Sequence, residues 1–432
     1  MRNIIIISYF FPPCNLTASQ RVFSWAKYLH KFGIYPTIIT RRWDHEINTL
    51  SDVSKATPKV LLHEINDTYE VYYLPYKANL RDKIYVNSNF KLKFLRRILT
   101  FFEVFFQLWT NRIIPFKNLY DFSHDLISKN PNKFDLLVIS GNPFIQFKFG
   151  FLLHRKFKIK WIADYRDAWT TSEINFINKN KVFSVLNLLE RYFEKKWVSS
   201  ASLITASSGG IADGIGNLVK VNSFPLYNGF DHEELEKVSI DEKYEIFTIT
   251  YVGTLYDGQR IELFCEAFKE LIDKNYTDKI QLLFPGLSFY LTQENRIKKI
   301  LSGYERYYSC TPRINRKQIL EIEKKSHVLL HIAWDQHKGI IASKIYEYIG
   351  SGTPILVCPS DNGEIESIVK AANVGVCLNN KDEIINFIRE KYEQSKNPKE
   401  EISNSNSFDF SRLIQVEKLS DLILKEVNHE MD

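Results

Sequence analysis

The amino-acid sequence predicts an α/β protein of two domains, each built around a parallel β-sheet with helices on both faces. Three observations support this prediction. Short β-branched or apolar runs alternate with longer helical patterns, the alternation begins again in the second half, and a turn signal with a charged stretch separates the two sets. A chain of 432 residues, 44% of them apolar, is long enough to bury a core in each domain.

The first set of strands lies in the N-terminal half. Each apolar run ends in a polar turn and leads into a helical pattern, which is the order expected of βαβ units. Near-continuous apolar runs are typical of parallel strands that are buried on both faces. The expected strands are Asn3–Ser8, Tyr35–Thr40, Leu136–Ser140, Trp161–Asp164 and Leu203–Ala206.

The second set of strands repeats this order with helical patterns between its members. The expected strands are Phe247–Val252, Ile280–Pro285, His327–Ala333, Pro354–Cys358 and Val374–Cys377. Both halves are therefore expected to be Rossmann-like domains.

The Asn228-Gly229 pair is a turn signal, and a charged stretch follows it. We therefore expect an N-terminal domain over residues 1–228 and a second domain over residues 229–395. Residues 396–432 read as a polar linker and a final helix, which we expect to cross back to the first domain. Two open parallel sheets joined in this way would share a cleft at the carboxyl ends of their strands, where such folds bind ligands.

Composition limits the class of protein. The five cysteines are scattered without a Cys-x-x-Cys pair, which suits reduced thiols in a reducing compartment. The N-terminus lacks a secretory cleavage pattern, and no apolar run reaches the roughly 18 residues of a membrane-spanning helix. We expect a cytoplasmic protein that is soluble or lies on a membrane.

One segment concentrates positive charge. Residues 77–117 contain nine basic residues against Asp82 and Glu103, a surplus that exceeds the net charge of +6 for the whole chain. Within it, residues 89–116 interleave Lys and Arg with Phe and Trp, which suits an interfacial element on anionic lipid. A pair of core helices with solvated charges explains the residues almost equally well. Nucleic acid is a weaker explanation, because no binding motif accompanies the segment.

The most informative segment covers residues 335–356. A strand end leads into a loop with Gly339, a helix begins near Ser343, and a Gly-Thr-Pro sequence ends that helix before the next strand. Backbone N–H groups at the helix start, with Lys344 in its first turn, form a plausible seat for a diphosphate. Glu347, one turn further, could accept hydrogen bonds from a ribose diol. A Lys–Glu pair alone favours an ordinary surface helix, but the three features together favour a binding site.

Several motifs in order resemble the family 4 glycosyltransferases, retaining enzymes of the two-domain B fold, and in particular those that build bacterial surface polysaccharides. The resemblance covers nearly the whole chain. The motifs are Ser8–Pro13 with Ala18–Val22, Ala163–Trp169, Asn228–Asp231, Tyr251–Leu255 and the segment 335–356.

The resemblance implies transfer of a sugar from a nucleoside diphosphate-sugar to a hydroxyl of a glycan or lipid-linked acceptor, with retention. Attack on the same face, assisted by the donor's own phosphate, requires no protein nucleophile, so stabilising the leaving diphosphate is the main catalytic task. A lipid-linked acceptor also favours membrane contact through 89–116, at the inner face of the cell membrane. The residues expected to bind the donor are Gly253, Thr254, Arg260, Gly339, Ile340, Ser343, Lys344 and Glu347.

The acceptor side is expected in the first domain. Asp164, Arg166 and Asp167 follow a predicted strand, and a carboxylate there could orient or deprotonate an acceptor hydroxyl. We expect Asp167 to be the catalytic residue, with Asp164 as the second candidate. A structural Asp–Arg pair that caps the turn is about as consistent with the residues. Ser19 and Arg21 are expected to line the acceptor side, although an ordinary helix surface explains them equally well.

The sequence also departs from the family pattern. The family often has two acidic residues separated by seven positions in the donor motif; Glu347 matches the second, but Gly339 stands at the first. The Arg that often follows the glycine of the donor-domain turn is Thr254, and Arg260 is the nearest substitute for a downstream Lys. The side chain that would engage the sugar's hydroxyls is missing, so the resemblance does not name the sugar.

No metal or other cofactor is expected. The chain lacks an Asp-x-Asp pair, and His327 and His331, four apart on a predicted strand, do not converge on one ion. We expect these histidines to be packing residues. Two other classes remain: a nucleotide-sugar epimerase or hydrolase of the same fold, and a non-catalytic, membrane-associated partner of a polysaccharide assembly complex. A nicotinamide dehydrogenase is disfavoured, because no Gly-x-Gly-x-x-Gly follows the first strand.

Overall fold

The first strand, β1 (Arg2–Ser8), forms the centre of an eight-stranded sheet in the computed structural model, which describes residues 1–47, 49–86, 92–172, 181–240, 242–276, 279–334, 339–396 and 406–428. The sheet order is β3-β4-β2-β1-β5-β6-β7-β8, and all pairs are parallel except β3 with β4. Ile4 to Ile7 of β1 are fully buried, as expected of a central strand covered on both faces. The other strands are β2 (Ile34–Arg41), β3 (Leu62–Ile65), β4 (Glu70–Leu74), β5 (Leu136–Gly141), β6 (Trp161–Tyr165), β7 (Leu203–Ala206) and β8 (Ser223–Pro225).

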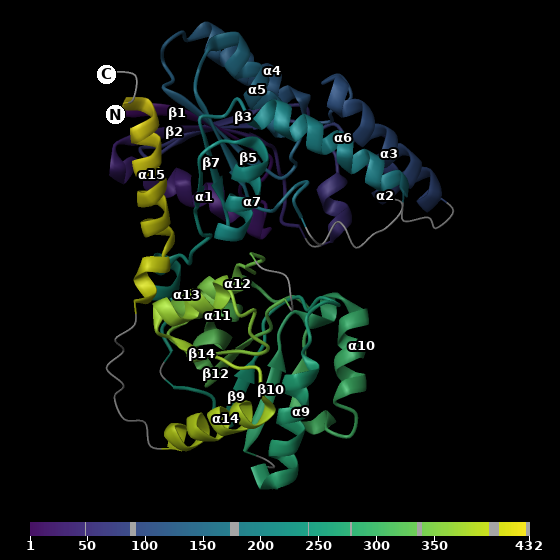
Figure 1. The fold of residues 1–432 in the computed structure, drawn as a ribbon, viewed down its shortest axis with the longest axis vertical. Helices are drawn as coiled ribbons and strands as arrows, with labels where there is room; N and C mark the ends of the chain where they lie inside the picture. The colour runs from purple at the N-terminus through teal and green to yellow at the C-terminus, as the bar shows by residue number, and fades with distance from the viewer. Residues whose placement is uncertain are drawn as a thin grey trace. The chain divides into compact units, whose positions relative to one another are not determined.

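Helices cover this first sheet (Figure 1). Ile5 and Ile7 share one core cluster with side chains of the helices that follow β4, β5, β6 and β7. Ile4 and Ile6 face the other way because successive strand residues alternate between faces. The helices are α1 (Thr17–Tyr28), α2 (Leu80–Val86), α3 (Lys93–Trp109), α4 (Lys117–Lys129), α5 (Gln146–Phe157), α6 (Lys181–Val198) and α7 (Gly209–Val219).

The second sheet has six parallel strands in the order β11-β10-β9-β12-β13-β14. They are β9 (Phe247–Thr250), β10 (Ile280–Phe284), β11 (Tyr308–Cys310), β12 (Val328–His331), β13 (Ile355–Val357) and β14 (Gly375–Cys377). One core cluster joins the sheet to α9 (Glu262–Leu271), α10 (Leu291–Ile300) and α14 (Lys381–Lys396). A second cluster joins it to α8 (His232–Glu236), α11 (Arg316–Lys325), α12 (Lys344–Ser351) and α13 (Glu364–Ala372).

The chain divides into two compact units, each with one of these sheets (Figure 1). Unit 1 comprises Met1–Leu226 and Val416–Asp432, and unit 2 comprises Tyr227–Gln415. Each sheet is parallel, or nearly so, and is flanked by helices. The predicted fold class, two Rossmann-like α/β domains, is confirmed.

The last helix, α15 (Arg412–Asn428), follows a 3₁₀ turn over Ser407–Phe410. Within unit 2, the amide of Arg412 donates to the carbonyl of Phe230 (2.8 Å). The approach is so close that a Cβ on Gly229, which has φ +66°, would lie 2.9 Å from the amide nitrogen of Arg412. The glycine of the predicted turn is therefore required by backbone packing. Within unit 1, Arg2 donates to the side chain of Asn428 (3.0 Å), so the start of β1 lies beside the end of α15 (Figure 1).

Candidate functional site

Two glycines shape the strand ends of unit 2. Gly253 follows β9 with φ +81°, and its amide donates to the carbonyl of Pro285 (2.8 Å) beyond β10. Gly286 has φ +86°, and a Cβ there would lie 3.5 Å from the Cα of Gly253. A Cβ on Gly253 itself would meet no atom within 4 Å. The loop after β9 therefore presents open backbone at the carboxyl end of the sheet, a surface that another group can approach closely.

Lys344, the first residue of α12, points at this loop. Its Nζ donates to the carbonyls of Val252 (2.9 Å) and Thr254 (3.4 Å) and lies 3.7 Å from the centre of the Tyr251 ring. One turn along the helix, the hydroxyl of Tyr348 accepts a hydrogen bond from the amide of Val252 (2.8 Å). Burial lowers the pKa of Lys344 to about 7. The amine is therefore fixed against the loop and is close to losing its proton at neutral pH.

The start of α12 also offers unpaired backbone donors. Ser343 is the N-cap residue but makes no side-chain capping bond. Within the described ranges, no acceptor is found for the backbone N–H groups of Ser343 and Lys344. Free N–H groups and the helix dipole make such an end favourable for an anion. Gly339 (φ +82°) and the half-buried Ile340 lead into it, whereas residues 335–338 of the predicted donor motif lie outside the described residues.

Glu347 is held in place by two residues that the sequence reading did not single out. Its Oε1 accepts from Arg316 Nη1 (2.8 Å), and the Nε of Arg316 donates to both carboxylate oxygens of Glu234 (2.6 and 2.8 Å). Burial works to lower the pKa of Arg316, but the carboxylates of Glu347 and Glu234 outweigh it and raise that pKa. Oε2 of Glu347 has no hydrogen-bond partner among the described residues. One oxygen is thus anchored while the other remains available to a ligand.

Two further predicted donor residues lie on the same loop. The carbonyl of Thr254 accepts hydrogen bonds from Lys344 (3.4 Å) and from the hydroxyl of Tyr251 (2.8 Å). Arg260 is exposed just before α9. The structure therefore groups Gly253, Thr254 and Lys344 tightly.

Glu323 of α11 is a buried acid that sequence reasoning missed. It is fully buried, and neither carboxyl oxygen has a hydrogen-bond partner among the described residues. Burial, followed by the negative charge of Glu347, raises its pKa well above the usual range. Burial of this carboxyl therefore favours its protonated form over the carboxylate. A single glutamate on a charged amphipathic helix carried no sequence signal for this environment.

In unit 1, Asp164 and Arg21 form a buried ion pair. Arg21 Nη2 lies 2.7 Å from Asp164 Oδ1, and both side chains are almost inaccessible. Ser140 and Thr205 from the neighbouring strands also donate to the carboxylate (2.9 and 2.8 Å), while Arg21 Nη1 donates to the carbonyl of Leu226 (2.7 Å). These contacts tie α1 to β5, β6 and β7. These contacts favour a structural role for Asp164 and Arg21 over a direct contact with an acceptor.

The neighbouring residues reach the surface. Asp167 is exposed, with 64% of its side chain accessible, and pairs loosely with Arg166 at 3.8 Å. The guanidinium of Arg166 lies 5.5 Å from the ring centre of Phe10, and burial lowers its pKa. Ser19 is buried, and its hydroxyl donates to the carbonyls of Cys14 and Leu16 (2.5 and 2.8 Å). Of the predicted residues in unit 1, Asp167 and Arg166 are therefore the ones that a ligand can contact.

His331, in β12, and His327, just before this strand, are packing residues, as expected. His327 Nδ1 accepts from the amide of Thr248 (3.0 Å), and its ring stacks on Phe247. His331 is buried, and burial lowers its pKa to about 3. Burial also lowers the pKa of His327 to about 4, so both rings are neutral at physiological pH.

Comparisons with known proteins identify the fold. No family model matches the chain, and no curated protein matches it. Among solved structures, sucrose-phosphate synthase from Thermosynechococcus elongatus is 12% identical with a TM-score of 0.58, over 100% of this chain and 99% of that one. A glycosyltransferase from Rickettsia africae is 13% identical with a TM-score of 0.58, over 99% and 98%. Anabaena HepE in complex with UDP is 11% identical with a TM-score of 0.51, over 100% and 98%. At these identities the likeness shows the fold, which is the two-domain glycosyltransferase B fold.

Proposed function

We propose that this chain is a retaining glycosyltransferase that moves a sugar from a nucleoside diphosphate-sugar to a hydroxyl group. The observation that carries the proposal is that Lys344, at a helix start with free N–H groups, donates to the open glycine loop after β9. Positive charge and backbone donors at one helix start are what a diphosphate requires. HepE, which shares the fold, holds UDP.

Lys344 and the helix start are proposed to stabilise the diphosphate as it leaves the sugar. Charge on the phosphate oxygens increases as the glycosidic bond breaks, and fixed donors stabilise that charge without reorganising. The free Oε2 of Glu347 is proposed to accept hydrogen bonds from the ribose hydroxyls, while Arg316 keeps the carboxylate in position. Gly253, Thr254, Arg260, Gly339, Ile340 and Ser343 would complete the donor site.

The acceptor is proposed to be a glycan or a lipid-linked sugar in the synthesis of a bacterial surface polysaccharide such as O-antigen, capsule or exopolysaccharide. Asp167 is proposed to orient or deprotonate the acceptor hydroxyl, with Arg166 beside it, because these side chains are accessible at the strand ends of unit 1. The enzyme would act in the cytoplasm at the inner face of the cell membrane, in contact with anionic lipid through residues 89–116.

Thermal unfolding with a panel of nucleoside diphosphates and their sugars tests the donor site. A ligand that binds the native state raises the melting temperature. We expect one base to stabilise the chain and its sugar conjugate to be consumed only when an acceptor is added. Consumption without an acceptor would indicate a hydrolase or epimerase instead, and a panel without any shift would indicate a non-catalytic partner.

Glu347→Gln is expected to raise KM for the donor by about tenfold or more, because a charged acceptor of ribose hydrogen bonds becomes neutral. Initial rates over a range of donor concentrations measure this change. Glu321→Gln is the matched control, since Glu321 lies on the exposed side of α11 in a weak 3.9 Å ion pair with Lys317. Equal KM values for both variants would contradict the assignment of Glu347.

Diphosphate affinity is expected to fall as the pH rises above 7. Burial gives Lys344 a pKa of about 7 in the free protein, and a bound diphosphate stabilises the charged amine and so raises that pKa. Below pH 7 the amine is already charged and this contribution is constant. Above it, binding must take up a proton, so Kd should rise by about tenfold per pH unit until the pKa of the complex is reached.

Titration calorimetry with UDP, GDP and ADP in buffers of different ionisation enthalpy measures both Kd and proton uptake between pH 6 and 9. Lys344→Arg is the control, because a guanidinium stays charged over this range and should flatten the profile. Wild-type affinity that is independent of pH between 7 and 9, with no proton uptake, would contradict the role of the Lys344 amine.

A further inference from the structure

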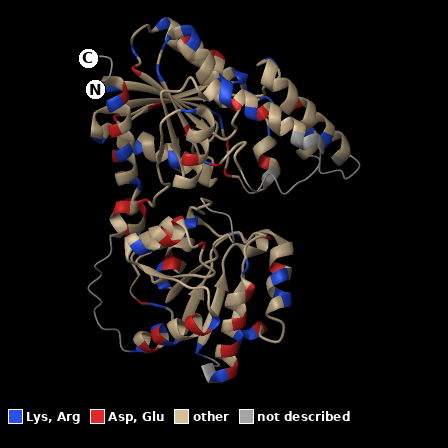
Figure 2. Cartoon of the chain, in the orientation of Figure 1, with Lys and Arg blue, Asp and Glu red and all other residues tan. Residues whose placement is uncertain are grey.

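Large apolar side chains are exposed together on α3 and α6. Of the 21 exposed large hydrophobic side chains of the described residues, eight lie on these two helices. They are Phe94, Leu95, Phe102, Phe106, Trp109, Val185, Leu188 and Tyr192. Figure 2 shows α3 as a mostly tan ribbon, since Glu103 is the only Lys, Arg, Asp or Glu in its second half. Exposed apolar side chains concentrated in this way mark an interaction surface.

The two helices form one continuous surface. The ring of Trp109 at the end of α3 meets the ring of Phe193 of α6 edge-on, with centroids 4.9 Å apart. The ammonium of Lys148, from α5, donates to the carbonyls of Gln107 and Leu108 (2.8 and 3.2 Å) and so holds the end of α3 against the body of unit 1. The end of α3 therefore lies against α6, so the two helices that expose apolar side chains are neighbours.

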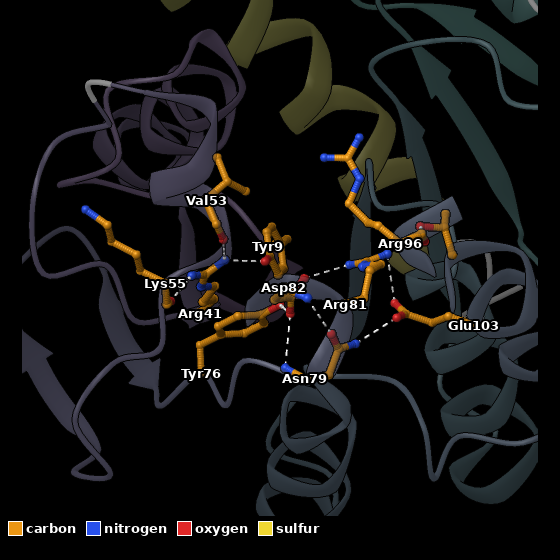
Figure 3. Close-up of polar contacts among 11 residues, drawn as sticks. Tyr9, Arg41, Val53, Lys55, Tyr76, Asn79, Arg81, Asp82, Arg96 and Glu103 are labelled. Carbon is orange, nitrogen blue, oxygen red and sulfur yellow. Dashed lines mark hydrogen bonds and ion pairs between the residues drawn. The ribbon is translucent and has the colours of Figure 1, made fainter. Parts of the chain in front are cut away.

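A polar network joins α2 and α3 to the residues that follow β2 and β4 (Figure 3). Tyr76 donates to Asp82 Oδ2 (2.6 Å), and Arg81 pairs with Asp82 and with Glu103, each at 3.0 Å. Arg41, at the end of β2, lies 3.6 Å from the centre of the Tyr76 ring. The carboxylate of α3 is thus directed into the protein.

The acids of α6 are directed inward as well. Glu190 accepts from Trp169 Nε1 (3.3 Å), and Glu194 accepts from the hydroxyl of Tyr165 (2.9 Å) and from Thr170. In contrast, the basic residues Arg97, Lys195 and Lys196 are exposed. Charge on the outer face of the two helices is therefore positive.

We infer that α3 and α6 together form a membrane-binding face that inserts its apolar side chains into an anionic bilayer while its basic residues contact lipid phosphates. Apolar insertion with flanking Lys and Arg is the composition of an interfacial surface. No helix among the described residues is long and apolar enough to cross a membrane. The inference extends the proposed membrane contact beyond residues 89–116 to α6. Membrane binding would give access to a lipid-linked acceptor, and this part of the inference rests on the proposed function.

Charge favours a bilayer over a second copy of this chain as the occupant. In a twofold interface the same patch meets itself. Exposed Arg97, Lys195 and Lys196 would then face like charges, whereas anionic lipid neutralises them.

Co-sedimentation of the full chain with vesicles tests the inference. We expect binding to phosphatidylcholine vesicles that contain 30 mol% phosphatidylglycerol and little binding to phosphatidylcholine alone, with affinity falling as salt is added. Leu188→Ser should lower the partition coefficient by about tenfold, because one buried apolar side chain is lost. Lys195→Gln with Lys196→Gln should lower it by roughly tenfold at low salt and less at high salt.

Leu291→Ser is the matched control, since Leu291 on α10 is 68% exposed and Leu188 is 67% exposed. Equal effects of the two Leu→Ser variants, or equal binding to both vesicle types, would overturn the inference. A wild-type dimer that Leu188→Ser converts to monomer would also overturn it in favour of a second copy. Vesicle binding is measured without donor and the thermal shifts without vesicles, so failure of one proposal is distinguishable from failure of the other.

Discussion

Lys344→Ala is expected to lower the rate of sugar transfer by about 10²–10³, the loss typical of removing one preorganised stabiliser of developing charge. The variant should also lose the thermal stabilisation by nucleoside diphosphates. Its melting temperature without ligand measures the cost of losing the contacts with Val252 and Thr254 separately from any effect on binding. Steady-state rates, together with melting temperatures with and without ligand, measure all three quantities.

The rates and melting temperatures together distinguish the loss of the donor site from damage to the fold. Lys298→Ala is the control, since Lys298 is an exposed residue of α10 in a surface ion pair with Glu294. Lys344→Arg, which retains a positive charge, should keep part of the activity. A Lys344→Ala variant that transfers sugar at the wild-type rate would contradict both the donor site and the leaving-group role.

Arg21→Ala is expected to destabilise the chain by about 3–5 kcal/mol, because it leaves the buried Asp164 carboxylate without its charge partner. Ser140 and Thr205 would still donate to Asp164, but neither supplies a positive charge. Urea unfolding, followed by tryptophan fluorescence and by circular dichroism, measures the change in the free energy of unfolding and shows whether both probes follow one transition.

Asp167→Ala is expected to have a much smaller effect on stability than Arg21→Ala. Asp167 is exposed and pairs loosely with Arg166, so its loss should change stability by less than about 1 kcal/mol. The double variant Arg21→Met, Asp164→Leu should recover part of the loss seen for Arg21→Ala, since an apolar pair leaves no buried charge. If Arg21→Ala were as stable as the wild type, the structural role assigned to this ion pair would be wrong.

The central strands could be predicted from the sequence because each buries a run of apolar residues. The prediction missed β3, β4, β8 and β11, and for the three edge strands β3, β8 and β11 the reason is physical. All four residues of β3 are exposed, so it carries no apolar signal, and β8 and β11 are three residues each. An edge strand is defined by its backbone hydrogen bonds to the neighbouring strand. The spacing of apolar residues in the sequence does not reveal this pairing.

The donor motif placed Lys344 and Glu347 on one helix, but it could not supply their partners. Arg316 and Glu234 come from other helices, and a contact across 82 residues leaves no local pattern.

The motif around Asp164 and Asp167 contains two carboxylates with opposite environments. Asp164 belongs to β6 and points into the protein, while Asp167 lies beyond the strand end and is exposed. Strand register, rather than residue type, separates their roles.

The order of synthesis gives the last helix a particular significance. Residues 416–428 complete unit 1, and their Val416, Leu419 and Ile423 are fully buried there. The ribosome makes the whole of unit 2 before these residues exist. The N-terminal 226 residues therefore receive this helix only after all of unit 2 has been synthesised, so unit 1 can be completed only after unit 2 has been made. A fragment that stops at residue 226 would leave the surface that receives these three side chains open to water or to another chain.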